Sequence, residues 1–232
     1  MIYITGDKHG DFSRIAEFCE EYETSTDDIL VVLGDAGINY YLDDRDLALK
    51  EDLSQLPITL FCVHGNHEER PENIQTYLDK NWHGGMVYYE DEYPNILFAS
   101  DGAIYDLDGA RTIVIGGAYS VDKYYRLSQG LGWFKSEQPD EYVKSFVESQ
   151  IKKAGGRFDF IFSHTCPQKF IPYEAFLPNI DDTVIDRSTE EWLDEIEEKM
   201  DYDRWFFGHF HTEKILGKYA IFYENIEYLD DF

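Results

Sequence analysis

The sequence predicts an α/β fold, and three features of the chain support this prediction. Apolar runs at 2–5, 29–33 and 58–63 read as buried strands that alternate with helical patterns, which is typical of parallel βαβ units. From 84 to 117, short apolar runs are separated by Asp, Gly and Pro, which indicates antiparallel strands and a second sheet. No repeat or linker interrupts the chain, so residues 1–232 are expected to form a single domain.

Two helices are expected between the first three strands. After the strand Ile2–Thr5, Asp11 is expected to cap a helix whose apolar residues recur at helical spacing from 12 to 22. A second helical pattern runs from 42 to 56, and Pro57 closes it. Strand and helix therefore alternate as parallel connections require.

The second half of the chain contains longer irregular stretches. Residues 119–138 are rich in aromatic, glycine and polar residues without a clear period, which predicts a loop that could lie over a site. Helical spacing follows at 143–151, and Ser188 with Glu191 has the spacing of a capping box for a later helix. The other expected elements are strands at 86–89, 96–99, 103–107, 112–115, 158–163, 205–207, 215–216 and 219–223, and an irregular stretch at 171–186.

Charge and composition count against several classes of partner. The 47 acidic and 20 basic residues give a net charge of -27, so the long-range field should repel nucleic acid backbones and anionic membranes. A small anionic substrate is compatible with this charge, because bound cations can invert the local potential at a metal site. The chain shows neither a membrane span nor a signal peptide pattern, and its 3 cysteines are scattered, which favours the cytoplasm.

Polar side chains cluster where five of the expected strands end. They are Asp7 and His9, Asp35, Asn66 and His67, His164, and His209 and His211. Ligands in open α/β sheets bind just beyond the carboxyl ends of strands, and imidazole with carboxylate suits Zn, Fe or Mn rather than Ca. A single Asp-X-His or Gly-Asp is more often ordinary turn chemistry, but five such ends together predict a metal site.

The order of these motifs resembles the pattern of the calcineurin-like metallophosphoesterase superfamily. That pattern is Asp-X-His, Gly-Asp, Gly-Asn-His-Glu or Asp, a lone His, and Gly-His-X-His, and it matches this chain from Asp7 to His211. The resemblance implies an α/β four-layer αββα sandwich, in which helices flank two mixed β-sheets. It also implies hydrolysis of a phosphomonoester or phosphodiester by a hydroxide that bridges two divalent metal ions, with Mn, Fe or Zn as candidates.

The resemblance further implies a role for each matching residue. Asp7, His9 and His211 would hold one metal, Asn66, His164 and His209 would hold the other, and Asp35 would bridge them. A bridging carboxylate is reasonable because two cations about 3.5 to 4 Å apart repel each other. His67 would donate a proton to the leaving oxygen, and Glu68 would bond backbone amides of its own loop.

The chain departs from the Ser/Thr phosphoprotein phosphatases, which the motifs at 6–10 and 65–70 resemble. Their motif Gly-Asp-X-Val-Asp-Arg-Gly reads here Gly-Asp-Ala-Gly-Ile-Asn-Tyr at 34–40. Ile38 therefore replaces the acid that orients the loop histidine, and Asn39 replaces the arginine that clamps phosphate. A phosphoprotein phosphatase and a non-catalytic scaffold with the same fold stay open as alternatives.

Three arginines could bind phosphate in place of the arginine that Asn39 replaces, namely Arg45, Arg70 and Arg126. A guanidinium binds two phosphate oxygens at once, although each of these residues also fits a surface ion pair on an acidic protein. Arg126 stands out because the stretch around it lacks a packing rationale. Arg126, Arg70 and Asn39 are thus the expected substrate contacts, and the expected partner is a small phosphorylated molecule rather than a long nucleic acid or a membrane.

Overall fold

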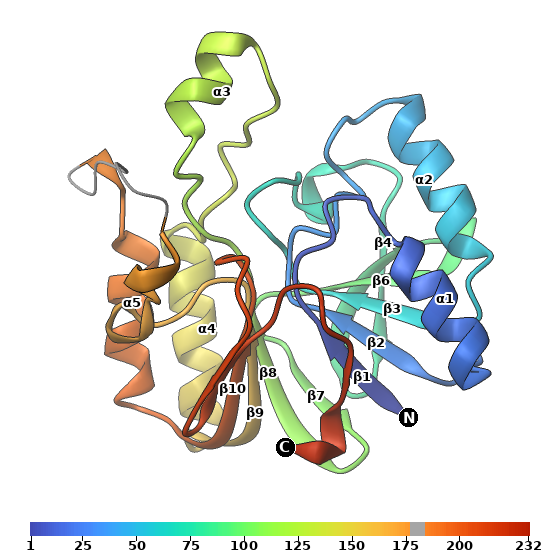
Figure 1. Cartoon of the computed structure of the whole chain (residues 1–232). Coiled ribbons are helices and arrows are strands. Elements are labelled where there is room, and N and C mark those ends of the chain that lie inside the picture. Colours follow the sequence, from blue (N-terminus) through green and yellow to red (C-terminus); the bar gives the residue numbers. More distant parts are fainter. Residues whose placement is uncertain (177–183) are drawn as a thin grey trace.

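The computed structural model describes residues 1–176 and 184–232, so part of the irregular stretch expected at 171–186 lies outside the described residues. Within them, two mixed β-sheets face each other, and helices cover the outer side of each sheet (Figure 1). This arrangement confirms the predicted α/β fold class, with two mixed sheets flanked by helices.

The first sheet has 7 strands in the order β13-β1-β2-β3-β6-β5-β4. Its central strands β1, β2, β3 and β6 run parallel, whereas β13, β5 and β4 pair antiparallel with their neighbours. The bounds are β1 Ile2–Thr5, β2 Ile29–Val32, β3 Thr59–Cys62, β4 Leu78–Trp82, β5 Gly85–Glu90, β6 Tyr93–Ala99 and β13 Glu227–Tyr228. Every residue of β1, β2 and β3 is buried, because helices cover one face of these strands and the second sheet covers the other.

The second sheet has 6 strands in the order β11-β12-β10-β9-β8-β7. Strands β12, β10, β9 and β8 run parallel, and β11 and β7 are antiparallel edges. The bounds are β7 Ile104–Leu107, β8 Ala110–Ile115, β9 Arg157–Ser163, β10 Asp201–Phe207, β11 Lys214–Leu216 and β12 Tyr219–Ile221.

Helices form the two outer layers, with α1 and α2 on the first sheet and α4 and α5 on the second (Figure 1). The bounds are α1 Ser13–Tyr22, α2 Asp44–Ser54, α3 Lys123–Gln129, α4 Glu141–Lys153 and α5 Ser188–Glu197, with short 3-10 turns at Pro71–Asn73, Gln168–Phe170, Tyr173–Ala175 and Leu229–Asp231. In contrast, α3 projects from the layers on an arm of its own. Among the described helices, none combines the length and apolar character that crossing a membrane requires.

Three apolar clusters hold the layers together. The central cluster lies between the sheets, and the other two lie beneath the helices on either side. Successive residues of one strand enter different clusters: Phe61 packs in the central one, whereas Leu60 and Cys62 pack on the side of α1 and α2. This alternation follows from the strand period of two, and it explains why the strands read as continuous apolar runs.

The prediction that residues 84–117 form a second sheet is only partly right. Strands β5 and β6 extend the first sheet, where β6 pairs in parallel with β3, and the second sheet begins at β7 and β8. The sequence of a short strand does not show which strand it pairs with. Here β6 pairs with β3 and β8 pairs with β9, and both partners are distant in the sequence. The chain passes from one sheet to the other between Ala99 and Ile104.

Two local predictions are wrong. Residues 119–138 contain the helix α3, which has no buried residue and therefore lacks the apolar stripe by which a helix is recognised. Ser188 is the first residue of α5 rather than its cap, and its backbone N–H donates to Asp186. At α1, in contrast, Asp11 does accept the backbone N–H of Ser13, although the helix begins only at Ser13.

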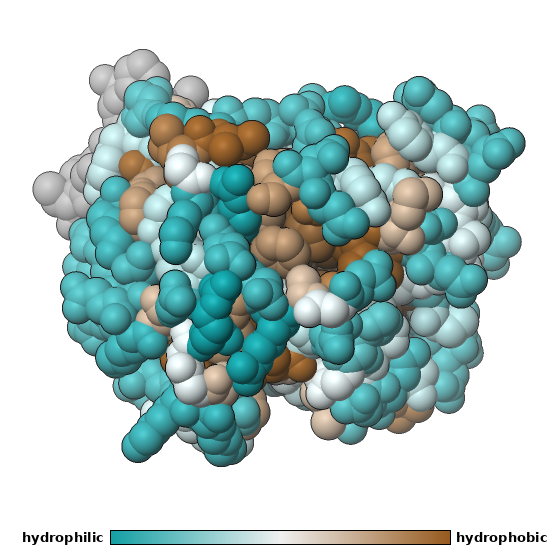
Figure 2. Space-filling model, turned by 90° about the horizontal axis from the view of Figure 1, so that it is seen from below, coloured by the Kyte–Doolittle hydropathy of each residue, from teal (hydrophilic) through white to brown (hydrophobic). Residues whose placement is uncertain are grey.

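The parallel strands run upward in Figure 1 from the N-terminus, so their carboxyl ends meet at the upper edge of the sandwich. Viewed from below, the opposite face is mostly hydrophilic, with hydrophobic residues gathered near its middle (Figure 2). The predicted site residues belong to the loops of the upper edge.

Candidate metal centre

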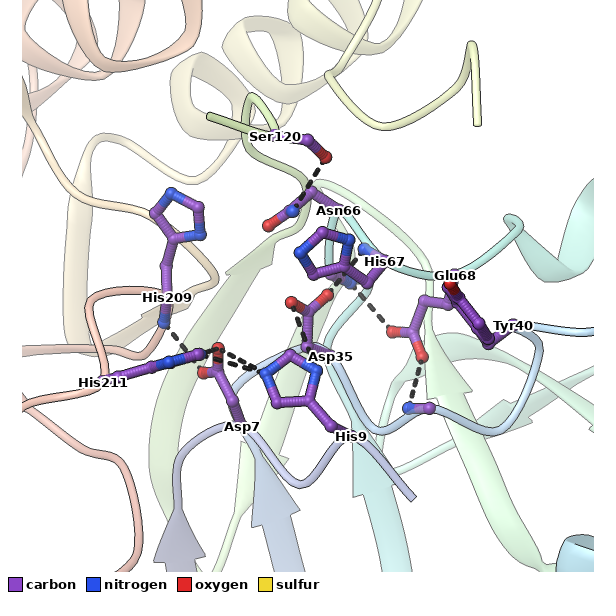
Figure 3. A network of polar contacts seen from close by, with 12 residues as sticks. Asp7, His9, Asp35, Tyr40, Asn66, His67, Glu68, Ser120, His209 and His211 are labelled. Atoms are coloured by element: carbon purple, nitrogen blue, oxygen red, sulfur yellow. Dashed lines mark hydrogen bonds and ion pairs between the residues drawn. The ribbon is translucent and has the colours of Figure 1, made fainter. Parts of the chain in front are cut away.

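Loops from both sheets bring the predicted site residues together in one cluster (Figure 3). Asp7 and His9 follow β1, Asp35 follows β2, Asn66 and His67 follow β3, His164 follows β9, and His209 and His211 follow β10. The ends of these strands thus converge where the two sheets meet.

Glycines allow these loops to approach one another closely. A Cβ atom added at Gly34, where φ is +98°, would lie 2.1 Å from His164 Nδ1. A Cβ atom added at Gly208 would lie 2.3 Å from Asp7 Oδ1. Real Cβ atoms do not tolerate such distances, so glycine is required for the cluster to close.

Four of the predicted site residues have left-handed backbone conformations. The φ angles are 48° at His9, 47° at Asp35, 67° at His209 and 47° at His211. For residues with a Cβ this conformation costs roughly 1–2 kcal/mol, and such strain collects at functional sites. The surrounding packing therefore holds these side chains in an arrangement that their own backbone preference opposes.

The first group of candidate ligands is Asp7, His9 and His211. Asp7 Oδ2 lies 3.3 Å from His211 Nε2 and 3.9 Å from His9 Nε2, and the two ring nitrogens are 3.0 Å apart. Among the described residues no hydrogen bond to this buried oxygen is made, although the His211 ring lies beside it. A buried carboxylate oxygen without a donor is costly, and a cation bound by the three side chains would satisfy it.

The second group centres on His164 and Asn66. His164 Nδ1 lies 2.8 Å from the carbonyl oxygen of Leu33, which can only accept, so Nδ1 carries a proton. The Asn66 amide donates from Nδ2 to Ser120 Oγ at 3.0 Å, and its Oδ1 therefore faces His164 Nε2 at 2.8 Å. When the ring is neutral, Nε2 carries a lone pair, and it faces a lone pair on Asn66 Oδ1. Two lone pairs repel each other, so this contact is favourable only if a second proton or a cation lies between the two atoms.

Asp35 lies between the two groups. Its Oδ1 is 3.6 Å from His164 Nε2, and its Oδ2 is 3.9 Å from His9 Nδ1. The backbone N–H of His67 donates to the same Oδ1 at 2.7 Å, which fixes the carboxylate. Asp7 belongs to two sets of possible ligands whose atoms lie within 4.8 Å of one another, one with His9 and His211 and the other with Asp35 and His164. The position of Asp35 between His164 and His9 suits the bridging role expected of it, and that role stays a prediction.

Electrostatics favour ionised carboxylates in the cluster, but they shift the pKa values of His209 and His211 in opposite directions. Burial raises the pKa of Asp7 and Asp35, but the neighbouring histidines outweigh it and hold both pKa values below their ordinary range. Burial lowers the pKa of His209 to about 3, whereas the contact with Asp7 raises the pKa of His211. Ionised carboxylate and neutral imidazole are the forms that bind a metal ion, so the shifts of Asp7, Asp35 and His209 fit divalent cations, whereas His211 must release any proton it holds before it can bind one.

His67 lies beside this cluster, with its ring centroid 5.7 Å from that of His9. Burial lowers its pKa, while the carboxylates of Asp35 and Asp122 act in the opposite direction. Ile38 is fully buried in the cluster beneath α1 and α2, so it offers the imidazole no polar partner. The acids that raise the pKa of His67 include Asp35 and Asp122, and Asp122 lies on the arm that carries α3.

Glu68 ties two loops of the site together. It accepts the backbone N–H of Gly65 at 2.9 Å and that of Gly37 at 3.2 Å. The predicted bond to its own loop is confirmed, and the bond to the loop after β2 is an addition. Burial, together with the charges of Asp35 and Asp7, raises the pKa of Glu68 to about 8.

Glu68 is expected to make the metal-free protein less stable as the pH rises. Its pKa is 4.5 in the unfolded reference and about 8 in the fold, so between these values only the folded state retains the proton. This contribution to the free energy of unfolding is fully present below pH 4.5 and is lost as the pH approaches 8. Glu68→Gln removes the titration, so the variant should lose less stability than the parent over that interval. Denaturant unfolding of both proteins in chelator checks this, and a difference that does not change with pH would contradict it.

A hollow of about 630 Å³ opens beside the cluster. His9, His67 and His211 form its inner wall. The hollow is also lined by Tyr40, Tyr41 and Arg45 from the segment that follows β2, and by Asp122 and Arg126 from the arm that carries α3.

The candidate substrate contacts are placed differently from one another. Arg126 lines the hollow, where it donates to Asp122 at 2.7 Å and to the Tyr40 hydroxyl at 2.8 Å. Arg70 is buried, donates to Asp101 and lines a different hollow. Asn39 is also buried and accepts the Tyr77 hydroxyl through Oδ1. Arg126 is thus the one of these three that the structure brings to the hollow beside the histidines.

Sequence reasoning missed Ser120, which is buried and orients the Asn66 amide. It follows β8, whose end carries Gly116 and Gly117 without an ionisable residue. The one feature of the sequence that could have pointed to Ser120 is its place shortly after a strand that ends in two glycines. Tyr40 and Tyr41, which line the hollow, gave no signal because tyrosine is frequent in this chain, with 18 residues.

Comparison with known proteins identifies a family that covers most of the chain. The family model described as calcineurin-like phosphoesterase matches residues 1–213. No curated protein matches the chain significantly.

Solved structures share the fold at low sequence identity. TT1561 of Thermus thermophilus is 11% identical over 96% of this chain and 87% of its own, with a TM-score of 0.51. A second crystal structure is 13% identical over 95% of this chain and 88% of its own, with a TM-score of 0.52. A protein of unknown function from Aquifex aeolicus, AQ665, reaches only 0.33 at 16% identity, over 71% of this chain and 80% of its own. At such identities the first two likenesses show the fold alone.

Proposed function

The chain belongs to the calcineurin-like phosphoesterase family, and from this premise we propose that it hydrolyses a small phosphate ester with two bound divalent cations. Membership supports metal-dependent phosphoester hydrolysis in general. The number of metals, their identity and the substrate are the parts proposed here. The observation that carries the proposal is the convergence of two donor groups on the carboxyl ends of strands from both sheets.

The residues present fit two cations. Asp7, His9 and His211 would hold the first, and the buried Oδ2 of Asp7, which accepts no hydrogen bond from the described residues, supports this. His164 and Asn66 would hold the second together with His209, and the contact of two lone pairs at 2.8 Å supports it. Asp35 would be shared. Imidazole, amide and carboxylate donors suit Mn, Fe or Zn, and manganese is the ion to test first.

Bound divalent cations supply two effects to such a reaction: they lower the pKa of water towards 7, and they neutralise charge on phosphoryl oxygens. The chain itself must provide the proton that the leaving oxygen requires. His67 is suited to this task, because it lines the hollow beside the candidate ligands without belonging to either group. Asp35 holds the backbone of His67 and so couples the position of the imidazole to that of the ligands.

Arg126 is the residue proposed to contact phosphate oxygens. Its guanidinium is oriented by Asp122, by the Tyr40 hydroxyl and by the carbonyl oxygen of Gly132. A guanidinium held in this way loses less conformational entropy when it binds an anion. Arg70 is a weaker candidate because it lies in a buried pair with Asp101 and lines a different hollow.

Two alternatives make different predictions. A phosphoprotein phosphatase would act on phosphoserine peptides, but Ile38 and Asn39 stand where that family has an acid and an arginine. A non-catalytic scaffold would have no need for the strained backbone of four candidate ligands. The three free, buried cysteines fit a reducing compartment, and we propose the cytoplasm.

The direct test is hydrolysis of an aryl phosphomonoester and the corresponding aryl phosphodiester by purified protein supplied with Mn²⁺. Turnover of at least one ester, lost on chelation and restored by added Mn²⁺, is expected. The metal content per chain is measured on the same sample. Two bound metals without turnover of either ester would overturn the enzymatic function and favour the scaffold.

His67→Ala is expected to lower the rate by about 10²-fold while leaving the metal content unchanged, which is the effect of losing a general acid. The loss should be larger for an alkyl ester than for an aryl ester, because a poor leaving group needs the proton more. His83→Ala is the matched control, since His83 is exposed and bonds a carbonyl oxygen remote from the cluster. Equal rates for His67→Ala and the parent would mean that His67 is not used.

A further inference from the structure

The hollow beside the histidines is larger than a phosphoryl group requires. Its volume of about 630 Å³ falls within the range of roughly 300–1,000 Å³ that is typical of sites for whole small molecules. The phosphoryl group would lie at the inner wall, next to His9 and His67. Most of the remaining space therefore faces the organic group of the ester.

The wall formed by Tyr40, Tyr41 and Arg45 offers planar surfaces. The Arg45 guanidinium lies 3.6 Å from the centroid of the Tyr41 ring, and the Tyr40 ring meets Tyr41 edge-on at 4.7 Å. The stack is accessible, because Tyr41 is 48% exposed and the Arg45 side chain is 62% exposed. Aromatic rings and guanidinium planes both stack on planar ring systems.

The charged side chains of the hollow already have partners. Arg45 pairs with Asp43 at 2.7 Å, and Arg126 pairs with Asp122 at 2.7 Å. Asp46 accepts the backbone N–H groups of Tyr41 and Leu42. Arg126 is already assigned to the phosphoryl group, the charge of Arg45 is met by Asp43, and Asp46 adds a negative charge. This part of the hollow therefore offers no spare positive charge to a second phosphate, and it favours a neutral organic group.

Tyr40 adds a directed polar contact. Its hydroxyl oxygen accepts a hydrogen bond from Arg126, so its own proton is available to an acceptor on a ligand. A planar ring with nitrogen or oxygen acceptors would use both the stack and this donor. The net charge of -27 opposes a long polyanion but not a single phosphate beside bound cations.

Resting on the phosphoesterase function proposed above, we infer that this hollow binds the organic group of the substrate and selects a neutral group with a planar ring, as in a nucleoside monophosphate. Tyr41 with Arg45 forms the stacking surface, and Tyr40 is the hydrogen-bond donor. A phosphoprotein substrate would not need this surface.

The test compares AMP with ribose 5-phosphate, which share a primary alkoxide leaving group and differ by the base. The Mn²⁺-loaded parent should show a kcat/KM about tenfold or more higher for AMP, mainly through KM, since stacking of a base is worth roughly 1–3 kcal/mol. Tyr41→Ala should lower kcat/KM much more for AMP than for ribose 5-phosphate and so remove most of that preference, because the stacking contact is made only by the base. Tyr142→Ala is the matched control, since Tyr142 is 80% exposed on α4 and lies outside the hollow.

A binding measurement separates this inference from the proposed function. Calorimetry of adenosine with the metal-free protein should detect binding that Tyr41→Ala weakens by about tenfold. Such binding in a protein that hydrolyses no ester would support the ring site and overturn the phosphoesterase function. Equal kcat/KM for AMP and ribose 5-phosphate, or an equal loss for both in Tyr41→Ala, would overturn the ring site. Turnover of a phosphoserine peptide in preference to AMP would also overturn it and would favour a phosphoprotein phosphatase.

Discussion

Asp35→Asn is expected to lower phosphate ester hydrolysis by about 10³-fold or more, because the variant loses a charge shared by both candidate metal positions. Neutralising developing charge with a metal is worth several kcal/mol, and each 1.36 kcal/mol is a factor of about ten in rate. Asparagine retains the oxygen that accepts the His67 backbone N–H, so the loop should keep its position. The loss is therefore attributable to the missing charge rather than to a rearranged loop.

The measurement combines turnover with metal content at limiting Mn²⁺. Asp28→Asn is a suitable control, since Asp28 precedes β2 whereas Asp35 follows its other end. The control should keep both metal content and rate. An Asp35→Asn variant that binds two metals and hydrolyses within about tenfold of the parent would mean that no shared carboxylate is needed.

Gly34→Ala is expected to destabilise the protein by about 2–5 kcal/mol and to impair metal binding. Two costs add up at this position. Alanine opposes a φ of +98°, and its Cβ would lie 2.1 Å from His164 Nδ1, in a fully buried ring. Moving His164 breaks its bond to the Leu33 carbonyl oxygen and displaces a candidate ligand.

Gly109→Ala separates the two costs. Gly109 has a similar φ of +90° but nothing within 4 Å of an added Cβ, so only the backbone cost applies there, about 1–2 kcal/mol. The difference between the two variants in denaturant unfolding therefore measures the clash with His164. Equal destabilisation by both substitutions would show that the loop after β2 relaxes around the added methyl group.

Much of the fold could be predicted because its strands are covered on both faces. β1, β2 and β3 were recognised within about one residue, since burial on two sides leaves continuous apolar runs. In contrast, β6 was assigned to the wrong sheet, because a strand carries no local record of its partner. α3 was missed because it packs little of its surface, so no apolar stripe marks it.

Much of the candidate site could also be predicted, because its residues stand in short motifs directly after strands. The order of Asp7, Asp35, Asn66, His164 and His209 was sufficient to indicate a metal site and the family. Their roles as ligands remain predictions, and the same holds for the proton donor His67. Parallel strands explain this success, since their carboxyl ends must lie at one edge.

The contacts that support the cluster join residues far apart in the sequence, so only the tertiary structure shows them. Ser120 orients the Asn66 amide from a loop 54 residues further along the chain, and Arg126 bonds the Tyr40 hydroxyl across 86 residues. Both pairs arise because the arm that carries α3 leaves the end of β8 and contacts the segments that follow β2 and β3, an arrangement that no local pattern encodes. Local pattern thus sufficed for the strands, the motif residues and the family, whereas the walls of the hollow and the support of each side chain required distant segments to pack together.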